Sequence, residues 1–320
     1  MFRIRRIFDD ALPIDRKGIE QAQQIMRAQF PLVSEAEFAG LGEKLCNPFK
    51  YRFRHLLFVA DDSGGNVRGC ALVSHDPDLG FFFLDYLATG RQLTGRGVGG
   101  ALYERVRDEA IAQGAIGIFF ECPPDDLSRI DSPEVLKWNI ARLRFYERYG
   151  ARPIINTDYQ RPIKPADRDL PMLVFDGLGK GRPLQREPAR EICRAILKRK
   201  YSHLCSPAYI EAVVSSFRDD PVRLREPRYV KVSALKPLPF RQQAHRRIVL
   251  VVNDKHDIHH VRERGYVEAP VRVEAILKEI EPTGLFHRIP PREHAESCIR
   301  NVHDNDYISY FRKVCQKVRP

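Results

Sequence analysis

The sequence predicts an α/β protein built around a mixed β-sheet. A strongly apolar run at residues 80–88 is followed by the glycine-rich run 94–100, and then by a helical pattern over residues 101–112. A buried strand at residues 116–122 and a further helical pattern up to Gly150 come next. Strands that alternate with helices in this way give a sheet covered by helices, so we expect an α/β sandwich.

The elements before this stretch fit the same class. Residues 2–7 alternate apolar and basic side chains and predict a strand. An amphipathic helix is expected over residues 14–30, bounded by two prolines, and a second helix over residues 34–46. Strands are expected around 53–60 and 67–75, because the sequence Asp-Asp-Ser-Gly-Gly between them is typical of a hairpin turn.

The helix that ends at Gly150 has a clear start signal. Ser132 is a suitable N-cap, Pro133 fits the first turn, and Asp131 and Glu134 place negative charge at the positive end of the helix.

The glycine-rich run from Thr94 to Gly100 lies between a predicted strand and a predicted helix. Glycines let a backbone approach a ligand closely, and the free N–H groups of a helix start favour an anion such as a phosphate. The run lacks the Gly-Lys-Ser/Thr of a P-loop. Glu121 stands near the spacing of a dinucleotide-binding acid, so that interpretation stays open, as does a simple tight turn.

Residues 94–99, Thr-Gly-Arg-Gly-Val-Gly, resemble the pyrophosphate-binding motif of the GNAT superfamily of N-acetyltransferases, Gln/Arg-x-x-Gly-x-Gly/Ala. Thr94 replaces the Gln or Arg of that motif. A second segment, Asn139 to Ala151, resembles the family's Asn…Tyr…Gly-Phe pattern, with Ala151 in place of the aromatic residue. The resemblance covers about residues 1–180 and implies the GNAT fold, a mixed twisted sheet that splays open at the cofactor site. It also implies transfer of an acetyl group from acetyl-CoA to a primary amine.

The resemblance implies which residues hold the acyl donor. The glycine run would bind the diphosphate, backbone groups of the preceding strand would hold the pantetheine arm and the thioester oxygen, and the helix asparagine would touch the arm. The implied donor-binding residues are Leu87, Ala88, Thr89, Thr94, Gly95, Arg96, Gly97, Val98, Gly99, Gly100 and Asn139.

Acetyl transfer to an amine needs a base, since only the neutral amine attacks the thioester. Asp85 interrupts an apolar strand, where an unpartnered acid is costly, and Glu121 ends the next strand. Either carboxylate could be the base by similarity to GNAT enzymes; we favour Glu121, because the longer acid at a strand end reaches a cleft more easily. Both could also be structural carboxylates. Tyr146 matches the position that donates a proton to the leaving thiolate in many GNAT members, although it could equally be a core aromatic residue.

The charge is unevenly distributed along the 320 residues. Residues 1–180 hold 25 basic and 25 acidic side chains, whereas residues 181–320 hold 28 and 17, a surplus of 11 that equals the net charge of +11. A basic half can indicate a nucleic-acid partner. We expect none, because no recognised reading helix or aromatic-rich sheet is visible, and favour a surface that would meet absent acidic elements.

The remaining composition indicates a protein of a reducing compartment. No apolar run reaches the length of a membrane helix, and the N-terminus carries acids where a signal peptide is apolar. The seven cysteines are odd in number and form no Cys-x-x-Cys pair, which argues against disulfides and structural zinc. We therefore expect a cytoplasmic protein.

The second half of the chain is expected to begin with a connector. Residues 181–246 contain a basic amphipathic helix over 188–201 and a second helix over 206–217, followed by a Pro- and Arg-rich extended stretch at 218–243. The glycines of residues 177–182 are interpreted as a linker.

Residues 247–320 open with the apolar run 248–252, typical of a parallel strand covered on both faces. Three further features follow: the Pro-Val-Arg start of a helical pattern over 269–280, the Arg-Ile-Pro-Pro at 288–291 and the Val-His-Asp at 302–304. Together with the apolar run they resemble the N-terminal segment of the histone deacetylase and acetylpolyamine amidohydrolase family. We expect a truncated segment of that kind, without its catalytic site. His256, His259 and His260 could suggest a metal site, but a polar loop is favoured and no metal is expected.

Two further expectations concern partners and function class. The segment 247–320 is too short to cover a buried strand, so it would pack on the first domain or self-associate. The alternative to catalysis is a non-catalytic acetyl-CoA-binding regulatory module attached to a deacetylase-like protein.

Overall fold

The computed structural model describes residues 2–31, 33–90, 97–130, 132–163, 170–231, 248–253, 271–283 and 286–317. The chain divides into two compact units, residues 1–238 and 239–320. The domain boundaries expected from the sequence, at residues 180 and 246, differ from this division.

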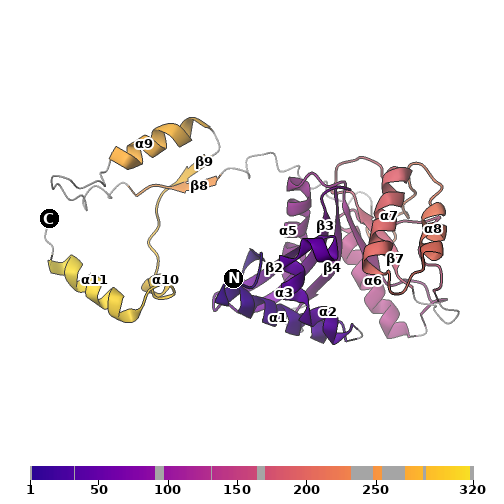
Figure 1. Cartoon of the computed structure of the whole chain (residues 1–320), viewed down its shortest axis with the longest axis horizontal. Helices are drawn as coiled ribbons and strands as arrows, with labels where there is room; N and C mark the ends of the chain where they lie inside the picture. The colour runs from indigo at the N-terminus through magenta and orange to yellow at the C-terminus, as the bar shows by residue number, and fades with distance from the viewer. Residues whose placement is uncertain are drawn as a thin grey trace. The chain divides into compact units, whose positions relative to one another are not determined.

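A seven-stranded mixed sheet forms the centre of the first unit (Figure 1). Its strand order is β1-β2-β3-β4-β5-β7-β6, in which only β4 and β5 run parallel. The strands are β1 (Phe2–Ile7), β2 (Arg54–Asp62), β3 (Val67–Asp76), β4 (Phe81–Thr89), β5 (Ile118–Cys122), β6 (Arg152–Pro153) and β7 (Met172–Asp176). The mixed α/β sheet expected from the sequence is confirmed, whereas β6 and β7 were not predicted.

Helices cover both faces of this sheet. They are α1 (Pro13–Gln29), α2 (Glu35–Ala39), α3 (Leu41–Cys46), α4 (Pro48–Tyr51), α5 (Val98–Ala112), α6 (Pro133–Glu147), α7 (Arg186–Lys200) and α8 (Pro207–Ser215). The single helix expected over residues 34–46 is divided in two at Gly40, which ends α2 and precedes α3. The start predicted for α6 is confirmed, since Ser132 Oγ accepts a hydrogen bond from the Val135 N–H at 3.4 Å.

The alternation of side chains along the strands assigns each helix to a face. Phe82 and Leu84 pack with α5 and α6 in one hydrophobic cluster. Phe81 and Phe83 point the other way and pack with α7 and α8. Leu57 of β2 packs with α1 to α3. Phe53, which lies four positions earlier and so on the same side of the extended chain, packs in the α7–α8 cluster. Helices α1 to α3 and α7 to α8 therefore share one face of the sheet.

Helix α7 changes the interpretation of the segment that follows residue 180. Its residues Ile192, Cys193 and Ile196 are fully buried and lie in one cluster with Phe81 and Phe119 of the sheet. The burial of these side chains makes α7 and α8 part of the packed core of the first unit, rather than helices of a free connector.

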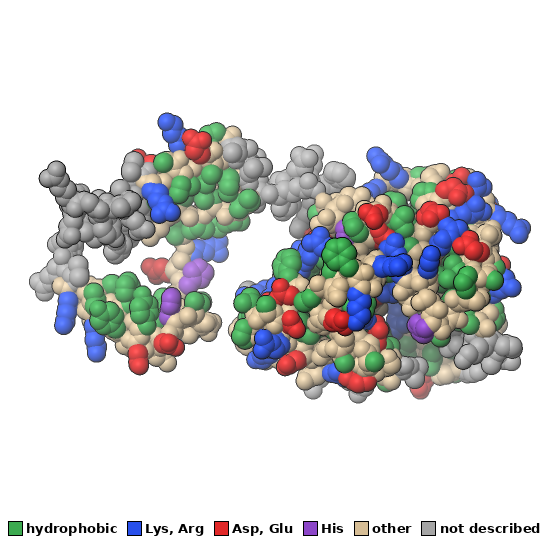
Figure 2. All heavy atoms as spheres, viewed as in Figure 1, with side chains coloured by type: hydrophobic (Ala, Val, Ile, Leu, Met, Phe, Trp, Pro, Cys, Tyr) green, Lys and Arg blue, Asp and Glu red, His purple; other side chains and the backbone are tan. Residues whose placement is uncertain are grey.

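The second unit contains a small parallel sheet. The described elements of this unit are β8 (Ile248–Val251), α9 (Val271–Ile280), a 3₁₀ turn (Glu281–Thr283), β9 (Phe286–Ile289), α10 (Glu296–Arg300) and α11 (Asn305–Lys317). The strand predicted at 248–252 is present and pairs in parallel with β9. It is not covered on both faces, because Ile248, Val249 and Val251 are all more than half exposed. Figure 2 shows hydrophobic side chains, in green, on the surface of this unit. β9 was not predicted.

Candidate active site

The strands β4 and β5 diverge in the middle of the sheet. Their parallel pairing is limited to Phe82 with Ile118 and Phe83 with Phe119. The antiparallel register between β3 and β4 shifts at the same level, because Leu72 faces Tyr86 while Val73 faces Leu84. One extra residue, Asp85, is thus inserted in β4 as a β-bulge, which bends a strand and increases its twist. The bulge and the end of the pairing together open a wedge between β4 and β5.

The bulge also decides which side chains face α7. Phe83 packs with α7, and strict alternation would turn Tyr86 to the opposite face. Because Asp85 is the extra residue, Tyr86 instead contacts the rings of Phe30 and Phe38 on the α1–α2 side, with centroids 5.1 and 5.7 Å away. Asp85 and Tyr86 consequently lie on the same face, and Leu87 returns to the α5 side.

Asp85 is held by a cation and a hydroxyl group. Lys200 Nζ, at the end of α7, forms an ion pair with Asp85 Oδ1, and Ser74 Oγ donates a hydrogen bond to Asp85 Oδ2 at 2.7 Å. The side chains of Asp85 and Lys200 are only 7% and 17% exposed. Both oxygens of this carboxylate are therefore engaged within the fold.

Glu121 lies on β5 at the matching position, two residues beyond the last pair with β4. The hydroxyl groups of Tyr159 and Tyr201 each donate a hydrogen bond to one Glu121 oxygen at 2.6 Å. Burial raises the pKa of this carboxyl above its ordinary value of 4.5, while the two phenol hydrogen bonds and the Lys200 charge oppose the rise. Glu121 thus faces neutral donors, whereas Asp85 faces a cation.

Tyr159, Tyr201 and Lys200 are site residues that the sequence analysis missed. They contact the two carboxylates across 38, 80 and 115 positions of the chain. No short sequence motif predicts contacts between residues so far apart in the chain. The only available signal is the end of the basic helix at 188–201, where an amphipathic pattern places Lys200 and Tyr201 next to its apolar face.

Tyr146 lies on the opposite face of the sheet, in the α5–α6 cluster. Its ring packs against Phe120 and Tyr103, with centroids 4.3 and 5.1 Å away. Burial raises the pKa of the phenol, so Tyr146 keeps its proton in neutral solution. This environment suits both a proton donor and a core aromatic residue.

Asn139 is buried on α6 with 4% of its surface exposed. Its Nδ2 donates a hydrogen bond to the Pro124 carbonyl at 2.9 Å, which ties α6 to the segment that follows β5. One role of Asn139 is therefore structural.

The glycine-rich run is described only from Gly97 onward; Thr94, Gly95 and Arg96 lie outside the described residues. Gly97 has φ +81°, a left-handed conformation that favours glycine, and a Cβ built there meets no atom within 4 Å. It is the N-cap of α5, which starts at Val98 rather than at the expected residue 101. The first turn of α5, including Gly99 and Gly100, has N–H groups without intrahelical acceptors, as at any helix start.

The end of β4 lies beside this helix start. Thr89 Cγ2 would be 3.7 Å from a Cβ at Gly99, and the Thr89 carbonyl accepts a hydrogen bond from Gln29 Nε2 at 2.9 Å. Leu87 and Ala88 precede it, on β4 beyond the residues that pair with β5. The candidate residues on β4 and α5 thus adjoin each other at one end of the wedge.

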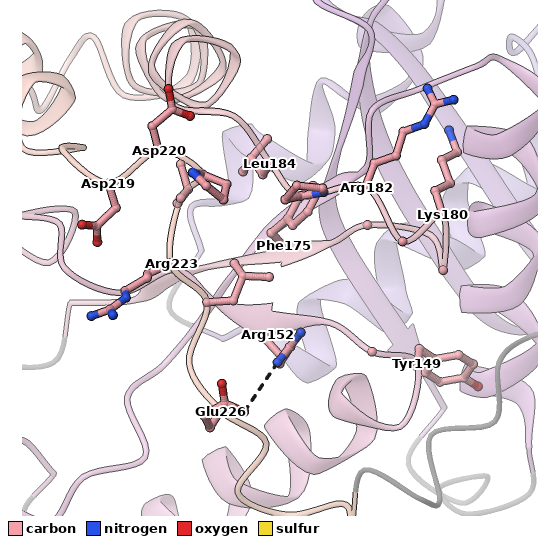
Figure 3. A pocket seen from close by; sticks show the side chains of 18 residues that line it. Tyr149, Arg152, Phe175, Lys180, Arg182, Leu184, Asp219, Asp220, Arg223 and Glu226 are labelled. Atoms are coloured by element: carbon pink, nitrogen blue, oxygen red, sulfur yellow. Dashed lines mark ion pairs between the residues drawn. The ribbon is translucent and has the colours of Figure 1, made fainter.

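A cavity of about 860 Å³ lies elsewhere, beside β6, β7 and residues 219–226 (Figure 3). Figure 3 shows Lys180 and Arg182 next to each other at its rim, and burial together with the Arg182 charge lowers the pKa of Lys180. None of the expected site residues that the structure describes lines this cavity, so the cavity is distinct from the wedge.

The described ranges contain no candidate metal cluster and no helix that could span a membrane. In that part of the chain, no group of three or more His, Cys, Asp or Glu side chains is placed to hold a metal ion. The histidines at 256, 259 and 260 fall outside it. None of the helices described there is both long and apolar enough to cross a membrane.

Comparison with protein families identifies the class of the first unit. Residues 19–151 match the family described as Acetyltransferase (GNAT) family, which is less than half of the chain. With the fold above, this match makes the matched part an acetyltransferase domain, and enzymes of this family use acetyl-CoA as acyl donor and an amine as acceptor. The match does not extend to residues 247–320, and the deacetylase-like interpretation of that segment has no support.

Solved structures with a similar fold include three acetyltransferases. An aminoglycoside 6'-N-acetyltransferase complexed with coenzyme A is 16% identical, with 57% of this chain and 99% of that chain covered and a TM-score of 0.42. The catalytic domain of the Tetrahymena GCN5 histone acetyltransferase, in complex with coenzyme A, is 14% identical (57% and 96% covered, TM-score 0.40). The ribosomal-protein-S18-alanine N-acetyltransferase from Escherichia coli is 19% identical (55% and 92% covered, TM-score 0.36). A comparison with curated proteins found no match.

Proposed function

We propose that the first unit transfers an acetyl group from acetyl-CoA to a primary amine at the wedge between β4 and β5. The observation that carries the proposal is the placement of two carboxylates, Asp85 and Glu121, on the two diverging strands and on one face of the sheet. Two carboxylates favour the approach of a cationic amine, and one of them can take the proton that the amine must lose.

Glu121 is the proposed base. A base must be free to change its charge, and Glu121 is bound by the neutral phenols of Tyr159 and Tyr201, with a raised pKa. Asp85 is instead engaged in an ion pair with Lys200 and accepts a hydrogen bond from Ser74. Proton uptake from the amine is therefore assigned to Glu121, and Asp85 orients the charged groups around it.

Tyr146 is the proposed proton donor to the departing thiol group. Its raised pKa keeps the hydroxyl group protonated, and the position matches the second motif of the GNAT resemblance. Its burial on the α5–α6 face would place this proton on the side of the sheet opposite to Glu121.

The donor-binding residues proposed are those of the β4 end and the glycine-rich run. The open space above Gly97 and the free N–H groups of the first turn of α5 suit a diphosphate. Leu87, Ala88 and Thr89 lie on the part of β4 that leaves β5, so their backbone groups can meet the pantetheine arm. Thr94, Gly95 and Arg96, with Asn139 on α6, complete the proposed set.

The acceptor is proposed to be a protein lysine, a polyamine or another small amine. A non-catalytic acetyl-CoA-binding module would bind the donor without releasing CoA in the presence of any amine.

The donor site can be tested by calorimetric titration of Gly97→Asp with acetyl-CoA. The substitution adds an anion where the diphosphate is placed, so affinity is expected to fall at least about tenfold. Gly114→Asp is the matched control, because Gly114 has φ +71° at the other end of α5 and also meets no atom. Equal affinities for the two variants would contradict the proposed donor site, and release of CoA with a panel of amines tests the transfer itself.

A further inference from the structure

The chain places a primary amine of its own at the wedge. Lys200 is the last residue of α7, and its Nζ contacts Asp85 Oδ1 at the bulge where β4 leaves β5. The same Nζ lies 4.9 Å from the ring centroid of Phe83, the last β4 residue paired with β5. This ε-amino group therefore occupies the region in which an acceptor amine is expected.

The surroundings of Lys200 are fixed by the fold. Ile196, one turn earlier on α7, is fully buried, and Tyr201, the next residue, donates a hydrogen bond to Glu121 at 2.6 Å. The Lys200 charge also acts on Glu121. The amine is thus held against Asp85 at the end of a packed helix, next to the residue that hydrogen-bonds Glu121.

We propose that Lys200 is an acetylation site of this protein and that the domain acetylates it within the same molecule. The inference rests on the proposed acetyl transfer at the wedge. It goes beyond that function because Lys200 lies on α7, outside the residues 19–151 that match the acetyltransferase family. The group transferred to Lys200 would be the acetyl group of acetyl-CoA.

The reaction balances without a further reagent. The Lys200 ammonium group gives one proton to Glu121, the neutral nitrogen forms a bond to the acetyl carbon, and the carbon–sulfur bond breaks. The second nitrogen proton leaves to solvent, and the sulfur is released as the thiol of CoA after taking up a proton. The product is a neutral amide, so the cation that faces Asp85 is lost.

The test is incubation of the full chain with isotope-labelled acetyl-CoA, followed by intact-mass and peptide mass spectrometry. We expect an added mass of about 42 Da, the mass of one acetyl group on lysine, located at Lys200. The rate constant should not depend on protein concentration, because transfer occurs within one molecule. Lys200→Arg keeps the positive charge beside Asp85 and should abolish the label.

Two controls separate this reaction from chemical acetylation. Lys198→Arg removes an exposed lysine two positions earlier on α7 and should leave the labelling unchanged. Glu121→Gln should slow labelling of Lys200 about 100-fold, the size expected for removing a general base. Labelling that is as fast in Glu121→Gln, or that is equal at Lys198 and Lys200, would overturn the proposal.

The outcomes also distinguish self-acetylation of Lys200 from the proposed acetyl transfer to other amines. If the protein releases CoA with an added amine but Lys200 stays unlabelled, the self-acetylation proposal fails and acetyl transfer stands. If acetyl-CoA does not bind and no CoA is released with any amine, both fail together.

Discussion

The two strands that border the wedge each carry a carboxylate, and the two carboxylates have different interaction partners. Asp85 on β4 and Glu121 on β5 each lie two positions beyond the last paired residues of the strands. Asp85 forms an ion pair with Lys200, whereas Glu121 accepts hydrogen bonds from the phenols of Tyr159 and Tyr201. The difference teaches that acids at matching places in a sheet can have partners of different chemistry, and the proposed proton exchange is assigned to the acid whose partners are phenol groups.

The substitution Glu121→Gln is expected to have the largest effect on the difference between the two carboxylates. Glutamine keeps the size of the side chain, accepts one phenol hydrogen bond with its oxygen and can donate from its NH2 group to the oxygen of the other phenol. It cannot take a proton, so kcat is expected to fall about 10²- to 10⁴-fold with little change in melting temperature. Steady-state release of CoA with a saturating amine measures this. If Asp85→Asn loses more kcat than Glu121→Gln, the base has been assigned to the wrong strand.

Asp85→Asn should act mainly on stability. It leaves the largely buried Lys200 cation without its partner, which is expected to lower the free energy of unfolding by about 2 kcal/mol, less than for a fully buried pair because Lys200 retains some exposure. Urea denaturation of both proteins provides the measurement. Asp78→Asn is the matched control: Asp78 is exposed and should change the stability by no more than about 0.5 kcal/mol. Equal stabilities for the two variants would show that the ion pair contributes nothing.

Tyr201→Phe and Tyr159→Phe sharpen the comparison on the β5 side. Each removes a hydrogen bond that lowers the pKa of Glu121, so the pKa should rise further. The base must be deprotonated, so activity is lost as pH falls through this pKa, in a window above the ordinary 4.5. The acid limb of kcat/KM against pH is therefore expected to move to higher pH in both variants. An unmoved limb would mean that Glu121 does not control it.

Local signals in the sequence predicted the centre of the fold well. The apolar run of β4, the left-handed glycine before α5 and the Ser132-Pro133 start of α6 each have a local physical cause, and each element is present. The strand β7 was missed, although it pairs with β5 along its whole length. Its five residues form a short apolar run without a periodic pattern, and only the long-range pairing makes it a strand.

The candidate site was predictable only in part, for the same reason. Asp85 and Glu121 could be selected because each places an acid in an apolar strand. Their partners could not, since Lys200 and Tyr201 reach them from a helix more than 75 residues away in the chain. The register shift that makes Asp85 a bulge depends on how β3 and β4 pair, and the residues around Asp85 carry no signal for it.

The bulge in β4 has a consequence for how this sequence can change. The opening between β4 and β5 coincides with one supernumerary residue in the count along β4, whatever side chain that residue carries. A replacement at position 85 alters the chemistry offered there while the geometry persists. The loss of a single codon in the same place would remove the extra residue, restore strict alternation with Tyr86 still on its present face, and draw the two strands together, so that this stretch tolerates substitutions but not a change of length.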